Sequence, residues 1–319
     1  MTTNEEETMD HGQMSRRRFL GTTAGSAAAA AGLGALGGAA PAAAAARGER
    51  LLPKPRLGVM LYTVRDLLKA DAAGTLAMIA DAGYRKVELA DPLGRTPEEF
   101  KVLLDRNGLR PIAYHQWIPP VFGQANPEAV LDTAEALGLK YSGSSLMTLP
   151  GVEEQNADLY KRLADQANQW GALAAERGIR FYYHNHNWEF AKDPRTGEVF
   201  YEILLEETDP KLVFFELDLF WIHYAGFDPL DYIQGAQKRF PLFHVKDGIP
   251  NQSQQPDPGF TDLGKGEIDF KRVFKALKNK NAHHYLLERD TQPDAEKTVR
   301  DGYRYLTRLR AKRKRKHAH

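Results

Sequence analysis

The feature that most constrains the fold is an alternation, repeated eight times, between short β-rich apolar runs and segments of helical periodicity. Each interval holds one helix candidate, so the chain is a series of βαβ units with right-handed crossovers. Eight such units close most simply into one barrel. We therefore predict a single-domain α/β protein, a (β/α)8 TIM barrel, over residues 56–307. The eight runs are 56–62, 86–90, 111–117, 140–147, 179–186, 211–220, 241–247 and 283–290.

An open doubly wound sheet is the alternative to a barrel. That fold normally carries a glycine-rich phosphate loop directly after its first strand. Here the first run ends at Tyr62, and no glycine follows before Gly74. The barrel is favoured for this reason. Because a Walker loop is absent as well, we expect no nucleotide cofactor.

Composition limits the chemistry. The chain of 319 residues contains no cysteine, which excludes disulfides, thiolate catalysis, cysteine-rich zinc sites and iron–sulfur clusters. Any metal must therefore bind to nitrogen and oxygen ligands. The hydrophobic fraction of 42% and the charged fraction of 27% are typical of a soluble globular protein.

The first 46 residues have the order of an export signal. A basic region at Arg16 and Arg17 precedes a weakly apolar Gly/Ala-rich run and a cleavage-like Ala40-Pro41-Ala42. The arginine pair followed by Phe-Leu resembles the twin-arginine signal, although Gly21 stands where that signal often has lysine. We predict export to the periplasm or beyond through the twin-arginine translocase, with no stable membrane insertion after cleavage. Residues 47–55 are expected to be a linker. A disordered alanine-rich segment is the alternative reading of the leader.

The other end is a basic tail, residues 308–319, with seven Lys and Arg and no acidic residue. Such a run invites a nucleic-acid interpretation. The body from Arg47 to Thr307, however, holds 33 basic and 38 acidic residues, a net charge of about −5. A nucleic-acid-binding domain needs a basic patch on the folded body. We therefore expect no nucleic-acid partner and interpret the tail as a solvated extension.

Polar residues occupy strand ends that a buried strand would otherwise keep apolar. Catalytic groups of this fold lie at those ends. Alternation along a strand places His184 with His186, and His244 with Lys246, on common faces. A single such residue is readily structural, and for Glu88 the alternative is an ion pair with Arg85 or Lys86. Several together indicate a divalent cation that neutralises them. The strand-end residues are Glu88, His115, His184, His186, Glu216, Asp218, His244, Lys246, Glu288 and Asp290.

The motifs HNHNWEF, ELDLFWIHYAG, HVKD, LGKGEIDF and LLERD occur in this order along the last four runs. Together they resemble the xylose isomerase-like sugar isomerase/epimerase family, which is related to endonuclease IV, over Leu57 to about Leu306. The resemblance implies one divalent cation, Mn, Mg, Co or Zn, held by four strand-end side chains, typically Glu, Asp, His and Glu. By position the ligands here are His184, Asp218, His244 and Glu288.

This chain departs from the family pattern at two of these positions. His184 replaces a glutamate that also serves as a catalytic acid or base, so a symmetrical two-carboxylate proton shuttle is in doubt. Glu189 is an outside candidate for that missing carboxylate. Trp221 stands where ketose epimerases of the family commonly place a substrate-contacting histidine.

The resemblance implies proton abstraction next to a carbonyl, with the cation stabilising the enediolate. Glu288 is expected to move the proton, with His186 or His184 as its partner and Lys246 as a donor to the oxyanion. The expected substrate contacts are Glu88, His115, Trp117 and Trp221.

Two outcomes of this chemistry remain open. Reprotonation makes the protein an exported, metal-dependent sugar isomerase or epimerase, which is the main prediction. Expulsion of a β-substituent makes it a dehydratase or lyase on a keto-sugar or 3-keto-glycoside, and the histidine-for-glutamate change mildly favours this outcome. An endonuclease IV-like nuclease and a non-catalytic sugar-binding barrel are the readings from other classes. A homo-oligomer is left open.

Overall fold

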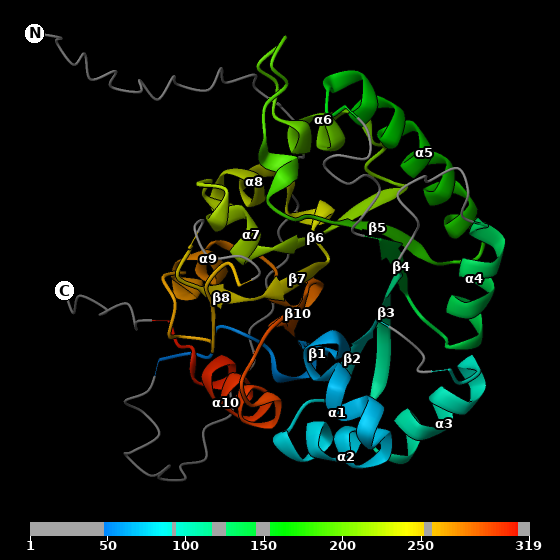
Figure 1. The fold of residues 1–319 in the computed structure, drawn as a ribbon, viewed down its shortest axis with the longest axis vertical. Coiled ribbons are helices and arrows are strands. Elements are labelled where there is room, and N and C mark those ends of the chain that lie inside the picture. Colours follow the sequence, from blue (N-terminus) through cyan, green and yellow to red (C-terminus); the bar gives the residue numbers. More distant parts are fainter. Residues whose placement is uncertain (1–47, 91–93, 117–125, 145–153, 252–256, 312–319) are drawn as a thin grey trace, which may run out of the picture. The chain divides into compact units, whose positions relative to one another are not determined.

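The computed structural model describes residues 48–90, 94–116, 126–144, 154–251 and 257–311. Eight parallel strands form a closed barrel in the order β1-β10-β7-β6-β5-β4-β3-β2 (Figure 1). Each strand falls within or next to one of the eight predicted runs, so the predicted (β/α)8 barrel is confirmed. The strands are β1 (Leu57–Met60), β2 (Lys86–Leu89), β3 (Arg110–Gln116), β4 (Tyr141–Ser144), β5 (Arg180–His184), β6 (Val213–Asp218), β7 (Leu242–Val245) and β10 (His284–Leu287).

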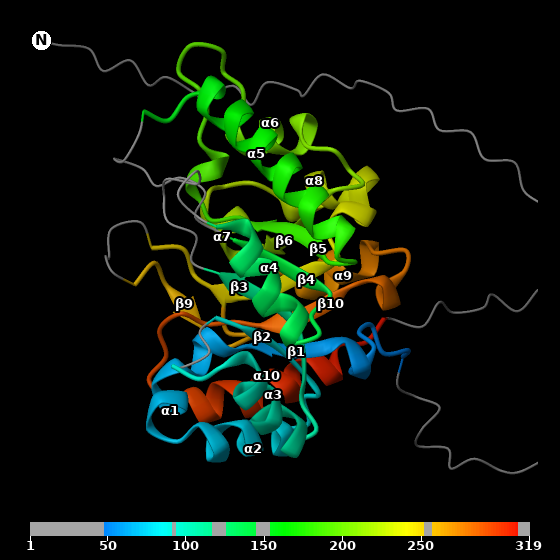
Figure 2. The same ribbon diagram turned by 90° about the vertical axis from the view of Figure 1, so that its right-hand side faces the viewer.

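Helices lie around the outside of the barrel (Figures 1 and 2). Several begin where the sequence supplies a capping side chain. Thr96, for example, accepts a hydrogen bond from the Glu99 backbone while Glu99 reaches back to the Thr96 backbone, a complete capping box. The helices are α1 (Arg65–Ala70), α2 (Ala72–Ala82), α3 (Pro97–Arg106), α4 (Pro127–Ala136), α5 (Ala157–Glu176), α6 (Phe200–Glu207), α7 (Leu219–Tyr224), α8 (Pro229–Ala236), α9 (Phe270–Ala276) and α10 (Ala295–Arg308).

The apolar core has two parts. The larger lies between the strands and the surrounding helices. The smaller consists of strand residues that include Tyr182, Leu242 and Leu286. These lie two residues before His184, His244 and Glu288 on the same strands, and therefore on the same face. Apolar side chains thus fill the barrel below the polar ones, which places His184, His244 and Glu288 at the C-terminal end of the strands.

The two ends of the barrel sequence pair with each other. The Leu51 backbone N–H donates to the Leu309 carbonyl at 3.0 Å, and the Ala311 N–H donates to the Glu49 carbonyl at 2.9 Å. Leu51 and Leu52 are buried. The region expected to be a linker, 47–55, therefore contains a segment that packs on the barrel, and the first residues of the predicted tail pair with it.

The leader and most of the basic tail lie outside the described residues. In the part of the chain that the structure describes, no helix combines the length and the apolar character needed to cross a lipid bilayer.

A long connection follows β7 at the C-terminal end of the barrel. Its ends form a small antiparallel pair, β8 (Asp247–Gly248) and β9 (Phe260–Thr261). The Asp247 carboxylate accepts hydrogen bonds from the backbone N–H groups of Gly264 and Gly266, at 2.7 and 3.1 Å. This carboxylate ties the connection to the strand that carries His244, and so fixes Phe260 near the barrel mouth.

Candidate metal centre at the barrel mouth

The structure brings together the four side chains predicted to be metal ligands. His184 ends β5, Asp218 ends β6, His244 lies on β7, and Glu288 directly follows β10. One nitrogen or oxygen atom from each lies within 4.8 Å of the corresponding atoms of the others. All four side chains are buried. Four consecutive strands of the barrel therefore deliver them to one point.

The inner atoms of this group contact one another and Lys246 as ion pairs rather than as well-directed hydrogen bonds. His184 Nε2 and His244 Nδ1 lie 3.9 and 4.0 Å from Asp218 Oδ2. Asp218 Oδ2, His244 Nδ1 and Glu288 Oε2 are buried, yet none of them makes a well-directed hydrogen bond. Two imidazole nitrogens and two carboxylate oxygens that converge in this way are ligands that a divalent cation accepts, so the donor set fits a metal.

Asp218 is held in place by its own chain. Its Oδ1 accepts hydrogen bonds from the backbone N–H groups of Phe220 and Trp221, at 2.9 and 3.1 Å, and so caps α7. Its backbone N–H donates to Asn185 Oδ1 at 3.0 Å. One carboxylate oxygen is thus occupied by the helix, and the other is directed into the four-residue group.

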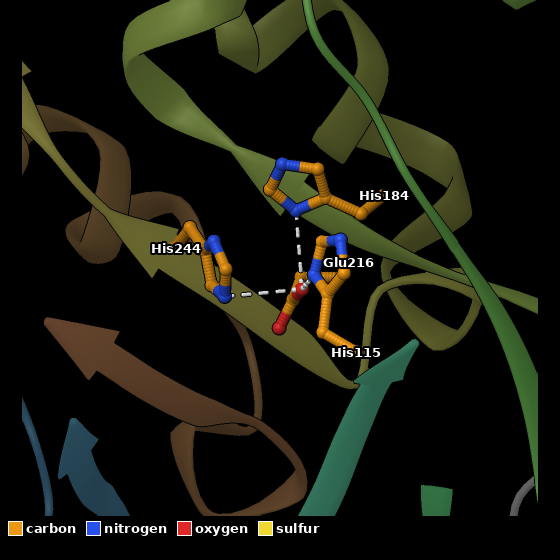
Figure 3. A group of neighbouring side chains, drawn as sticks. All are labelled: His115, His184, Glu216 and His244. Atoms are coloured by element: carbon orange, nitrogen blue, oxygen red, sulfur yellow. Dashed lines mark hydrogen bonds and ion pairs between the residues drawn. The ribbon is translucent and has the colours of Figure 1, made fainter. Parts of the chain in front are cut away.

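Two further carboxylates orient the histidines. Glu216 Oε2 lies 3.1 Å from both His184 Nδ1 and His244 Nε2, and His115 approaches it from a third side (Figure 3). Glu88 Oε2 lies 2.7 Å from His244 Nε2. An ionised carboxylate only accepts hydrogen bonds, so we assign the His184 proton to Nδ1, which leaves the lone pair on Nε2, facing Asp218. His244 has carboxylates at both ring nitrogens, so it carries two protons here, and a bound cation would take the place of the proton on Nδ1.

Glu88 and Glu216 both contact His244 Nε2, on the side of the ring away from the ligand group. Glu88, predicted to contact substrate, is fully buried and bonds to the Tyr182 hydroxyl and to His244 instead. Glu216 was among the polar strand-end residues named from the sequence, but no ligand or substrate role was predicted for it. A second set of possible ligands, His115, His184, Glu216 and His244, also meets the distance criterion and shares both histidines with the first.

Negative charge is in excess around these histidines. Burial and the neighbouring Glu216 raise the pKa of Glu88 to about 7. Burial alone would lower the pKa of His244, but Glu216, Glu288 and Glu88 outweigh it and raise that pKa well above its usual value. Four carboxylates so close together favour a cation between them.

Lys246 lies beside the group at the top of β7. Its Nζ is 2.7 Å from Glu288 Oε2, 3.0 Å from Asp218 Oδ2 and 3.0 Å from Asp290 Oδ1. Burial alone would lower the pKa of Lys246, but the three carboxylates outweigh it and raise the pKa well above the usual range. Lys246 therefore stays protonated and acts as a donor rather than as a base.

His186 has the opposite character. Its ring stacks on Trp188 with centroids 4.4 Å apart and lies 5.5 Å from the ring of Trp221. Burial, followed by the neighbouring His184 and Lys246, lowers the pKa of His186 well below its usual value. A neutral imidazole can accept a proton. Its Nδ1 makes no hydrogen bond in the structure.

Glu189 is not part of the ligand group. It is fully buried, accepts a hydrogen bond from the Tyr183 hydroxyl, and accepts another from the His186 backbone N–H at 2.8 Å. Its contacts hold the segment that presents His186 and Trp188. The outside candidate for the missing carboxylate therefore supports the loop instead.

The remaining predicted substrate contacts lie at the rim, with one exception. The His115 ring centroid is 4.8 Å from that of His184, and Trp221 lies 5.4 Å from Lys246 Nζ. Trp117 lies outside the described residues. Phe260, 5.3 Å from Lys246 Nζ, was not foreseen. It comes from the long connection, where no strand pattern marks it.

Comparison with known proteins places the fold in a family. A family model for the xylose isomerase-like TIM barrel matches residues 76–309. The chain belongs to this family. The resemblance inferred from the strand-end motifs is thereby confirmed for the xylose isomerase-like barrel itself, while the twin-arginine leader remains a prediction.

Individual xylose isomerase-like relatives differ in activity. An inosose dehydratase of Clostridium perfringens is 30% identical over 152 residues, 44% of this chain and 50% of that protein. The chain thus matches about half the length of this curated relative. The crystal structure of a sugar phosphate isomerase/epimerase from Parabacteroides distasonis is 26% identical, with a TM-score of 0.64. The match covers 78% of this chain and 96% of the Parabacteroides distasonis chain. The IOLI protein, solved with a zinc atom, is 16% identical with a TM-score of 0.61, over 79% and 96% of the two chains.

Proposed function

We propose that this protein is a metal-dependent lyase of the dehydratase type that acts on a keto-sugar or a cyclic keto-polyol. The observation that carries the proposal is the arrangement at the barrel mouth. Four buried ligands lie beside one fixed ammonium, Lys246, and one neutral imidazole, His186. The similarity to inosose dehydratases favours this function over the isomerase that the sequence motifs first suggested.

The cation would be held by His184, Asp218, His244 and Glu288. Two imidazoles and two carboxylates suit Zn, Mn or Co, and the zinc atom bound by the IOLI neighbour supports a divalent ion in a barrel of this family. When bound, such an ion polarises a carbonyl oxygen and stabilises the negative charge that develops on it. We prefer this set to the one that contains Glu216, because Glu216 binds the opposite nitrogens of the same histidines.

The protein's own groups would carry out the proton transfers. His186 removes the proton from the carbon next to the ketone, and the electron pair of the broken C–H bond forms an enolate. Lys246 donates a hydrogen bond to the enolate oxygen. The ketone re-forms as the C–O bond of the β-hydroxyl breaks, and His186 returns its proton to that hydroxyl, which leaves as water. The product is a conjugated enone.

The count of available bases favours elimination over epimerisation. Epimerisation needs a second group that delivers a proton to the opposite face of the carbon. The second group expected from the sequence is Glu288. We assign Glu288 to the cation, and its carboxylate is already 2.7 Å from both His244 Nδ1 and Lys246 Nζ, so it is not available as a proton donor. Elimination needs only the single base that His186 provides. An isomerase remains the second candidate, supported by the Parabacteroides distasonis neighbour.

The test is to incubate the full chain, loaded with Mn or Zn, with an inosose and with a panel of 3-keto-glycosides in deuterated water. Elimination produces a conjugated enone, read by ultraviolet absorbance and NMR. His186→Gln should lose this activity, while His223→Gln, a surface histidine paired with Glu267, should keep it. Deuterium exchange next to the ketone without loss of water or an aglycone would instead establish the isomerase.

A further inference from the structure

A cluster of cations lies at the end of the barrel opposite the metal centre. Because the strands are parallel, their first residues share one end. Lys86 and Arg110, the first residues of β2 and β3, are direct partners in the strand register. Like charges placed opposite each other on neighbouring strands are destabilising. The basic residues at the starts of five neighbouring strands are Arg56, Lys86, Arg110, Lys140 and Arg180.

Within the described residues, the charged groups that shift the pKa of Lys86 are all cations. Burial, and then the neighbouring Arg110, Arg56 and Lys140, lower the pKa of Lys86. No carboxylate opposes these three among the groups that act on it in the described structure. The repulsion within this cluster is therefore not offset by an ion pair of the chain's own.

A buried histidine at the same end has an unused donor. His284, the first residue of β10, is only 4% exposed, and its Nε2 lies 3.0 Å from Arg56 Nη1. A guanidinium group only donates hydrogen bonds, so Nε2 must be the acceptor and Nδ1 must carry the proton. His284 Nδ1 has no hydrogen-bond partner.

Neutral His284 is consistent with its environment. Burial, and then Arg56, Lys86 and Lys140, lower its pKa to about 3. The cluster therefore contains several cations and one buried N–H donor. A group that complements it is a hydrogen-bond acceptor with more than one negative charge. Buried donors are rarely left without an acceptor.

We propose that this end of the barrel binds a phosphate-type oxyanion, free or as a phosphomonoester, through Arg56, Lys86 and Arg110, with His284 Nδ1 as a buried donor. Phosphate oxygens accept charge-assisted hydrogen bonds from Arg and Lys and would remove the repulsion between them. This site is independent of the lyase proposed at the opposite end.

The experiment is thermal unfolding of the full chain in EDTA, with sodium phosphate compared with sodium chloride at equal ionic strength. Phosphate should raise the melting temperature of the wild type and of Lys161→Gln, an exposed control on α5. It should not raise that of Lys86→Met. In chloride, Lys86→Met should melt at a higher temperature than the wild type, because one of the repelling charges is gone.

Calorimetric titration with inorganic phosphate gives the affinity. Lys86→Met and His284→Phe should each weaken it at least about tenfold, the effect expected for one charge-assisted bond. If His284→Phe does not fold, Lys86→Met decides alone. The proposal is overturned if phosphate raises the melting temperature of the wild type no more than chloride does. It is also overturned if phosphate raises the melting temperature of Lys86→Met as much as that of the wild type. Tighter binding of glycerol phosphate than of inorganic phosphate would support a phosphorylated metabolite, and equal binding would support the free ion.

Discussion

Replacing Glu216 by glutamine tests how the histidines of the proposed metal centre are oriented. One oxygen of Glu216 lies 3.1 Å from both His184 Nδ1 and His244 Nε2. The amide of glutamine keeps the shape but presents a donor or a weaker acceptor, so each imidazole can move its proton onto the nitrogen meant for the cation. Carboxylates of this kind are typically worth 10- to 100-fold in metal affinity. Because one group serves two histidines, we expect a loss near the upper end, about 100-fold or about 2.7 kcal/mol.

The assay is competition for Zn or Mn between the full chain and a fluorescent chelator, with thermal unfolding as a check on the fold. Glu267→Gln is the matched control, since Glu267 lies 3.5 Å from a histidine, His223, on the surface. That variant should bind metal like the wild type. If Glu216→Gln also keeps the wild-type dissociation constant, Glu216 does not set the orientation of the histidines.

Three further predictions follow from named groups. Asp218→Asn should hold substantially less than one metal ion per chain by elemental analysis. The control is Asp228→Asn, which alters the cap of α8 and should keep full metal occupancy. Full metal occupancy and full turnover in Asp218→Asn would show that Asp218 is not a ligand. Burial raises the pKa of Glu189 to about 7, so the stability it contributes is complete below about pH 4.5 and is lost as the pH rises through 7. Glu189→Gln should flatten this decline by up to about 3 kcal/mol in urea titrations, and parallel curves for the two proteins would refute it. Replacing Arg16 and Arg17 by lysine should abolish export, and a normal extracytoplasmic level would exclude the twin-arginine route.

The fold was predictable because its signal is periodic. Eight β-rich runs separated by capped helices leave few topologies, and the structure closes them into the expected barrel. The meeting of four polar strand-end side chains at one point was predictable for a related reason. Charged side chains such as Asp218 and Glu288 at the ends of buried strands are costly unless something pairs with them.

Depth along the barrel axis was not predictable in the same way. Alternation puts Glu216 and Asp218 on one face, but it does not say that Asp218 faces the ligand group while Glu216 lies behind the histidines. The contact between Glu88 and His244 was not predictable for the same reason, and the register shift between Val87 and Glu88 has no sequence signal. Phe260 reaches the mouth through a connection without strand periodicity. Leu51 forms too short an apolar segment to mark itself as part of the barrel.

The pairing of Glu49 and Leu51 with Ala311 and Leu309 has a consequence for how the barrel can be rewired. The first and last described stretches lie side by side, so the folded unit is nearly cyclic in its connectivity. A short peptide that joins residues 48 and 311 would span this seam, and new ends could be opened at an exposed turn such as Gly108, between α3 and β3. Such a circular permutant keeps every strand-to-strand crossover except the one that is cut. The two paired stretches lie before β1 and after α10, at the pole away from the metal centre, so a peptide that joins them there leaves the barrel mouth open.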